Sequence, residues 1–126
     1  MNVKSILGNT RRADISFYSS GKIDITSRIA NLLGMMEGDT IDIMTAQGEF
    51  YLYISVHASD ISGRHEARCY PSKQGGRHFR TYCRRLSHAI LTECGSVPRV
   101  SLAAGMAVDV NGHRAIPIIT RAAIHK

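Results

Sequence analysis

The clearest structural signal in this chain is a run of alternating side chains, in the order Glu49-Phe50-Tyr51-Leu52-Tyr53-Ile54-Ser55-Val56. Apolar residues occupy every second position of this run, and polar or tyrosine residues lie between them. Strict alternation predicts a half-buried β-strand, because successive side chains of a strand point to opposite faces. A strand of this kind needs a second layer against its apolar face, so we expect a fold built around a β-sheet core.

Shorter alternating segments precede this strand and are separated by glycine turns. Residues 15–19, 23–25 and 41–43 each predict a short strand, with turns at Gly21 and Gly48. Between the second and third segments, Thr26 or Ser27 can cap a helix that Gly34 ends. The predicted order for residues 13–57 is therefore β-β-α-β-β.

The most regular helical pattern lies over residues 77–94. Apolar side chains recur on one side of a helical projection, at Phe79, Tyr82, Cys83, Leu86 and Ile90. Basic side chains recur on the other side, at Arg77, Arg80, Arg84 and His88. This period predicts one long amphipathic helix over 77–94, with Gly95 as its stop signal.

The rest of the chain supplies an arm, a loop and further strands. We expect a flexible N-terminal arm over residues 1–12, a basic loop over 58–76 and strands over 97–121, with a hairpin turn at Asn111-Gly112. The segment from Val100 to Ile119 is read either as a set of dimerisation strands or as the second half of one core. No internal repeat is visible in the sequence.

Together these patterns predict one α+β domain over residues 13–126. We expect a small, mostly antiparallel sheet or a barrel-like β core, with one short helix and one long amphipathic helix. The length of 126 residues and the 44% hydrophobic content are those of one globular domain. No apolar run is long enough for a membrane span, and no export signal is visible, so we expect a cytoplasmic protein that does not enter a membrane.

The cysteines predict neither a disulfide framework nor a metal centre. Their number is odd, their spacing is wide and no Cys-x-x-Cys pair occurs; they are Cys69, Cys83 and Cys94. No dinucleotide or phosphate-loop motif is present either, so we expect no cofactor.

Positive charge is concentrated in one segment of the chain. The net charge is +6, and the segment from Arg64 to His88 holds seven basic residues and one acid, Glu66. The other nine basic and nine acidic residues cancel. A neutral body with one cationic region is typical of proteins that attract a polyanion.

From this segregation we expect a nucleic-acid-binding protein, a DNA-binding regulator or accessory factor, that acts as a homodimer on DNA or RNA. Basic side chains would contact the phosphate backbone, and two tyrosines would stack on bases. The candidate contacts are Arg64, Arg68, Lys73, Arg77, Arg80, Arg84, Arg85, Tyr70 and Tyr82. Phosphate contacts carry no sequence information, so weak sequence preference and a steep salt dependence are expected.

Residues 15–54 resemble the AbrB/SpoVT/MazE family of swapped-hairpin DNA-binding modules. The resemblance lies in Gly21-Lys22-Ile23-Asp24-Ile25, Ile29, Leu33-Gly34-Met35, Gly38-Asp39 and Ile41-Asp42-Ile43. Thr26 stands where the family has proline, and Ala30 stands where it has arginine. The resemblance therefore implies DNA binding with Lys22 and Arg28 as phosphate contacts. The order of a sheet followed by a long helix is also similar to dimeric transcriptional coactivators that bind single-stranded DNA.

Two other functions are compatible with the sequence. The basic helix can instead dock an acidic protein, as in an antitoxin-like or regulatory interaction module. A small enzyme with Cys69 as its nucleophile is the third reading, because Arg64, Arg68 and Lys73 surround that thiol in sequence. We expect no catalytic activity, since no paired carboxylates or ordered base accompany the thiol.

Overall fold

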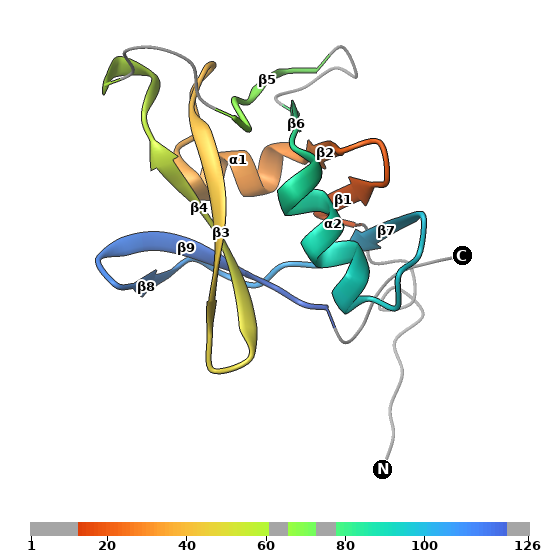
Figure 1. The fold of residues 1–126 in the computed structure, drawn as a ribbon. Coiled ribbons are helices and arrows are strands. Elements are labelled where there is room, and N and C mark those ends of the chain that lie inside the picture. Colours follow the sequence, from red (N-terminus) through yellow and green to blue (C-terminus); the bar gives the residue numbers. More distant parts are fainter. Residues whose placement is uncertain (1–12, 61–65, 73–77, 121–126) are drawn as a thin grey trace, which may run out of the picture.

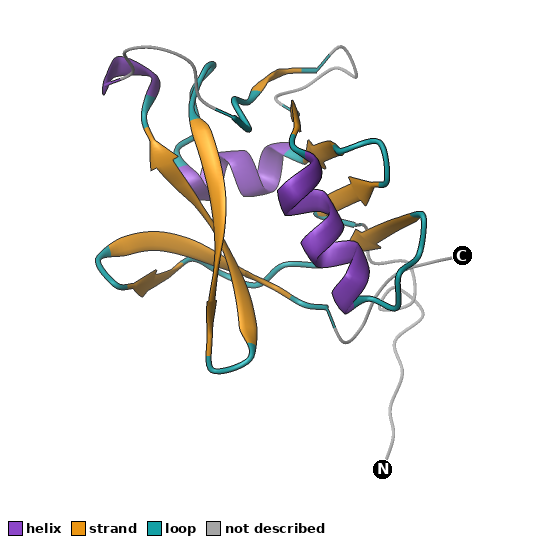
Figure 2. Ribbon diagram, in the orientation of Figure 1, coloured by secondary structure: helices purple, strands orange, loops and turns teal. Residues whose placement is uncertain are grey.

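A computed structural model describes residues 13–60, 66–72 and 78–120 of the chain (Figures 1 and 2). The described elements are, in chain order, β1 (Ile15–Tyr18), β2 (Lys22–Ile25), α1 (Ser27–Leu33), β3 (Thr40–Ala46), β4 (Glu49–Val56), a short 3-10 helix (Ala58–Asp60), β5 (Tyr70–Pro71), β6 (Phe79–Tyr82), α2 (Arg84–Glu93), β7 (Arg99–Leu102), β8 (Val108–Val110) and β9 (His113–Ile118). The described helices are too short or too polar to cross a membrane.

The strands form two antiparallel sheets. The five-stranded sheet has the order β5-β6-β2-β1-β7, and the four-stranded sheet has the order β3-β4-β9-β8. The predicted α+β class is confirmed, but the described sheets are not closed into the barrel-like core that was the alternative. Inward side chains of both sheets and of both helices meet in one hydrophobic cluster, which includes Phe17, Ile23, Leu52, Ile90 and Ile116.

The C-terminal strands belong to this same core. Val100 and Leu102 of β7 and Ile116 and Ile118 of β9 are almost completely buried. Of the two readings of the segment from Val100 to Ile119, the structure therefore favours the second half of one core.

The topology divides the chain into two halves with the same plan. In the first half, the hairpin β1–β2 is followed by α1 and the hairpin β3–β4; in the second half, β5–β6 is followed by α2 and the hairpin β8–β9. Each half places its first hairpin in the five-stranded sheet and its second hairpin in the four-stranded sheet. The halves join through three antiparallel pairs, β2 with β6, β1 with β7 and β4 with β9. The structure thus contains a repeat that we did not detect in the sequence.

The repeat extends to the turns and to the edge of the five-stranded sheet. Gln47-Gly48 and Asn111-Gly112 both have positive φ and close the second hairpin of each half. At one edge β7 pairs with β1, and at the opposite edge Thr40 forms an isolated bridge with Arg68 just before β5. The two halves share the order of their secondary-structure elements but not their amino-acid sequence, and their loops differ in length.

The predicted helix over 77–94 is wrong over residues 79–82. Phe79–Tyr82 is strand β6, and among the described residues of this range the helix covers Arg84–Glu93. Residues 79–82 also alternate, since Phe79 and Thr81 are buried while Arg80 and Tyr82 are not. Pairing with β2 therefore decides the local structure, because tertiary context overrides a short helical pattern. The predicted basic stripe is divided accordingly: Arg80 lies on a strand and Arg84 on the helix that follows.

Candidate nucleic-acid interface

The five-stranded sheet has one apolar face and one polar face. In β2, Ile23 and Ile25 are fully buried, so Lys22 and Asp24 point the other way. In β6, buried Phe79 and Thr81 leave Arg80 and Tyr82 on that same side. We call this side the open face; its outward residues are half-buried or exposed, and they are Ser16, Tyr18, Lys22, Asp24, Tyr70, Arg80, Tyr82, Arg99 and Ser101.

Strand register places aromatic and cationic side chains of the open face next to each other. Tyr82 lies opposite Lys22, and Tyr18 lies opposite Arg99. The ammonium group of Lys22 lies 4.2 Å from the centroid of the Tyr18 ring, which is a favourable cation–π distance. Rings and cations therefore alternate across β6, β2, β1 and β7.

A second row on the open face contains an ion pair. Arg80 lies opposite both Tyr70 and Asp24, on its two neighbouring strands. The Arg80 Nε donates to Asp24 Oδ1 at 2.6 Å, and Nη2 donates to Oδ2 at 3.4 Å. This hydrogen-bonded partner raises the pKa of Arg80, to which the Tyr82 hydroxyl also contributes. Arg80 is thus oriented but partly neutralised, and the uncompensated charge of this face comes from Lys22 and Arg99.

The structure brings several of the predicted contacts to the β5–β6 end of this sheet. Tyr70 and Tyr82 are among the most exposed large hydrophobic side chains, at 44% and 61%. Together with Arg68, Arg80 and the acidic side chain of Glu66 they line a groove of about 490 Å³. Four of the nine predicted residues therefore surround one groove.

Arg84 lies at the rim of the open face, against the β1–β2 turn. Gly21 has a φ of +98°, and a Cβ at this position would lie 2.9 Å from the Arg84 Cγ. The Gly21 carbonyl also accepts a hydrogen bond from the Cys83 backbone N–H, which fixes the start of α2 beside this turn. Glycine is therefore required here, and Arg84 is held against the turn that precedes Lys22.

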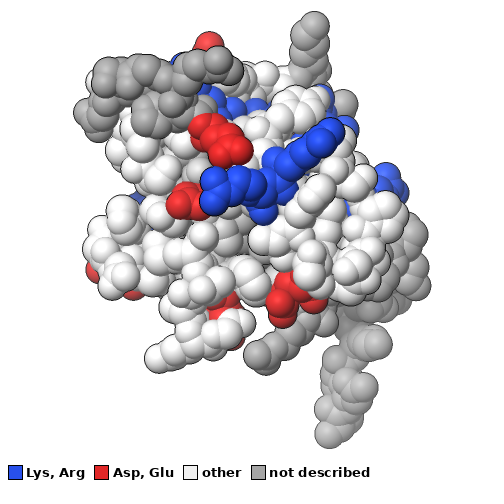
Figure 3. All heavy atoms as spheres, viewed as in Figure 1, with Lys and Arg blue, Asp and Glu red and all other residues white. Residues whose placement is uncertain are grey.

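Arg85 lies on α2 beside Glu66, an acid that also lines the groove. Its Nη1 lies 4.0 Å from Glu66 Oε1, and both side chains are well exposed, so the attraction between them is weak. Figure 3 shows the face of the molecule that carries α2, where basic and acidic side chains lie close together. The described basic side chains on this face do not form the continuous basic surface that the linear charge pattern indicated.

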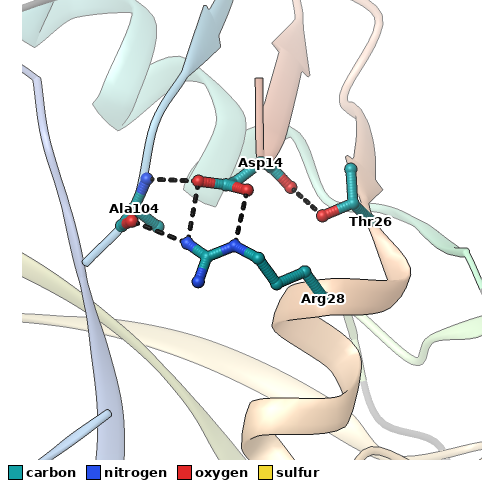
Figure 4. A network of polar contacts seen from close by, with 4 residues as sticks. All are labelled: Asp14, Thr26, Arg28 and Ala104. Carbon is teal, nitrogen blue, oxygen red and sulfur yellow. Dashed lines mark hydrogen bonds and ion pairs between the residues drawn. The ribbon is translucent and has the colours of Figure 1, made fainter. Parts of the chain in front are cut away.

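Arg28, the second phosphate contact implied by the family resemblance, is hydrogen-bonded to other groups of the protein (Figure 4). It donates to both carboxylate oxygens of Asp14, at 3.1 and 3.0 Å, and to the Ala104 carbonyl at 2.8 Å. Asp14 raises the pKa of Arg28 through these bonds and also accepts the Ala104 N–H at 2.8 Å. The arrangement ties α1 to β1 and to the segment after β7.

Cys69 does not have the surroundings of a nucleophile. The thiol is completely buried, and burial together with the charge of Asp39 raises its pKa to about 12. A reactive cysteine needs solvent access and a depressed pKa. Cys69 has neither, so it does not fit the role of nucleophile that the enzyme hypothesis gave it. Among the described residues, no group of three or more metal-ligating side chains is clustered.

Three predicted contacts, Arg64, Lys73 and Arg77, lie outside the described residues. The aromatic and basic residues of the open face that did not figure in the sequence prediction are Tyr18 and Arg99. Alternation along residues 15–18 is a signal that Tyr18 points outward. Arg99 joins it only through the pairing of β1 with β7, which no local pattern reveals.

Comparisons with protein-family models, curated proteins and solved structures found no match to this chain.

Proposed function

We propose that this protein binds nucleic acid on the open face of its five-stranded sheet. The observation that carries the proposal is the alternation of tyrosine rings with Lys22 and Arg99 across four neighbouring strands. Cationic side chains bind phosphates, and aromatic side chains on a sheet surface stack on bases.

Side chains around this face extend the contact surface. Arg68 and Arg84 lie at its margins, where they can contact phosphates that flank the central site. Arg64, Lys73 and Arg77 belong to the same basic stretch of sequence and are proposed as further phosphate contacts. Few side chains on this face are suited to base-specific hydrogen bonds. The affinity would therefore depend on the salt concentration more than on the nucleotide sequence.

The two-half plan supports the resemblance to swapped-hairpin DNA-binding modules. Residues 15–56 supply one hairpin to each sheet, and the second half of the chain supplies the matching hairpins. We propose that the second half occupies the place that a second copy of such a module would otherwise take. One chain would then contain a complete binding unit.

Fluorescence anisotropy with labelled single-stranded and double-stranded DNA of equal length, at low and moderate salt, tests the function. We expect binding whose logarithmic affinity falls linearly with the logarithm of salt concentration. No binding to DNA or RNA at low salt would contradict the proposal. Retention of an acidic protein without any nucleic acid would then support the interaction module instead.

A further inference from the structure

Tyr70 and Tyr82 form the two aromatic margins of the groove on the open face. Both side chains are exposed, although tyrosines of a monomeric sheet surface gain stability by packing against a neighbour. Among the described residues, the aromatic and cation–π contacts of this chain involve other rings, those of Tyr53, His113 and Tyr18. The faces of the Tyr70 and Tyr82 rings are therefore available to a ligand.

The register sets the spacing of these two tyrosines. Tyr70 lies opposite Arg80, and Tyr82 is two residues further along β6, so the two tyrosines are diagonal neighbours. Such neighbours are about 7–8 Å apart. Two parallel rings that hold a planar ring between them are also roughly 7–8 Å apart, since each van der Waals contact takes about 3.5–4 Å, so the backbone spacing of the two tyrosines matches such a sandwich.

The floor of the groove offers hydrogen-bond donors. Arg80 is held by Asp24 through Nε and Nη2, and its pKa is also influenced by the Tyr82 hydroxyl. A guanidinium has five N–H donors, so donors remain for the edge of a base or for a phosphate. Because Arg80 is already ordered by Asp24, a ligand would lose little conformational entropy in using it.

We propose that this groove takes one unpaired nucleobase between Tyr70 and Tyr82, so that the protein prefers single-stranded over double-stranded nucleic acid. The inference rests on the proposed function, since Lys22 and Arg99 would hold the adjoining phosphates. In a duplex the faces of the bases are stacked on each other, so only an unpaired base can present a face to these rings.

Anisotropy titrations at one low salt concentration test this preference. The probes are a labelled thymidine oligomer, the same oligomer with abasic sites in place of its bases, a uridine oligomer and a DNA duplex of equal length. Stacking is worth about 1–3 kcal/mol per base, so we expect the thymidine or uridine strand to bind roughly 5- to 150-fold more tightly than the abasic strand. The relative affinities of the thymidine and uridine strands distinguish DNA from RNA as the source of the base.

Variants of the two tyrosines test whether their rings cause the tighter binding of base-bearing strands. Tyr70→Ala and Tyr82→Ala should reduce the affinity for the base-bearing strand to that for the abasic strand, whereas Tyr82→Phe should retain the difference because it keeps the ring. Equal binding of base-bearing and abasic strands by the wild type, or tighter binding of the duplex, would overturn the inference and leave the proposed function standing. Absence of binding to every probe would overturn both.

Discussion

Tyr82 and Lys22 face each other across β2 and β6, one of the strand pairs that join the two halves of the chain in the five-stranded sheet. Both side chains point to the open face, and the Lys22 ammonium group also lies over the Tyr18 ring. This contact between the halves is therefore also the centre of the proposed binding surface. A change in the pairing of β2 with β6 would disrupt the fold and the surface together.

Replacement of Gly21 by alanine should destabilise the protein more than replacement of Gly48. Both glycines have positive φ, which costs a residue with a Cβ about 1 kcal/mol or more. Only at Gly21 would the new Cβ also meet Arg84, at 2.9 Å from Cγ and 3.1 Å from the backbone N. Urea denaturation should give a loss of about 1 kcal/mol for Gly48→Ala and roughly 2–4 kcal/mol for Gly21→Ala. Equal losses would show that Arg84 does not pack closely on this turn.

Asp14→Ala should lower the free energy of unfolding by about 1–3 kcal/mol, because the buried Ala104 N–H loses its acceptor. Arg28→Ala should cost less, since the Arg28 side chain is 44% exposed and water screens its attraction to Asp14. Asp109→Ala, at an exposed position of β8, is the control and should change stability little. Thermal or urea unfolding measures the loss of stability in each of the three variants. A larger loss for Arg28→Ala than for Asp14→Ala would contradict the expected ranking.

The Cys69 thiol should make the protein less stable at high pH. Its pKa in the folded protein is raised from 9.0 to about 12, so over this interval the unfolded chain loses the proton while the folded chain keeps it. The free energy of unfolding therefore falls as pH rises, by about 1.4 kcal/mol per pH unit from this group.

Urea unfolding at about pH 8 and about pH 10 measures this effect, with Cys69→Ala as the comparison. The loss of stability between the two pH values should be smaller in the variant. An identical loss in both proteins would mean that Cys69 titrates normally in the folded state.

The protein should be a monomer in solution, although the sequence led us to expect a homodimer. The second half of the chain already pairs with the first in both sheets, so one chain supplies the two-half arrangement. Sedimentation equilibrium should give a mass near 13.9 kDa. A mass of twice this value at micromolar concentration would favour the homodimer.

Local patterns predicted the first half of the fold correctly. The β-β-α-β-β order of residues 13–57 follows from glycine turns and alternation, which are properties of neighbouring residues. The hairpin at Asn111-Gly112 was predicted for the same reason. Strand β6 was missed because four residues satisfy a helical and a strand period equally well, and only pairing with β2 decides between them.

The open face could be predicted from the sequence only in part. Tyr70, Arg80 and Tyr82 were selected for their place in a basic segment, and Lys22 for its place in a family pattern. Their common position on one face depends on strand pairs that join distant parts of the chain. Arg85 belongs to the same basic segment but lies beside Glu66, which shows that linear charge density does not define a surface.

The most direct test of the proposed interface is the affinity of a Lys22→Gln, Arg99→Gln double variant for a labelled single-stranded oligonucleotide across a salt series. The control is an Arg85→Gln, Arg114→Gln double variant, which removes the same charge from α2 and from β9. We predict weaker binding and a salt slope reduced by about 0.7 per lost contact in the first variant, with the control close to wild type. Equal effects of the two double variants would contradict the claim that nucleic acid binds on the open face.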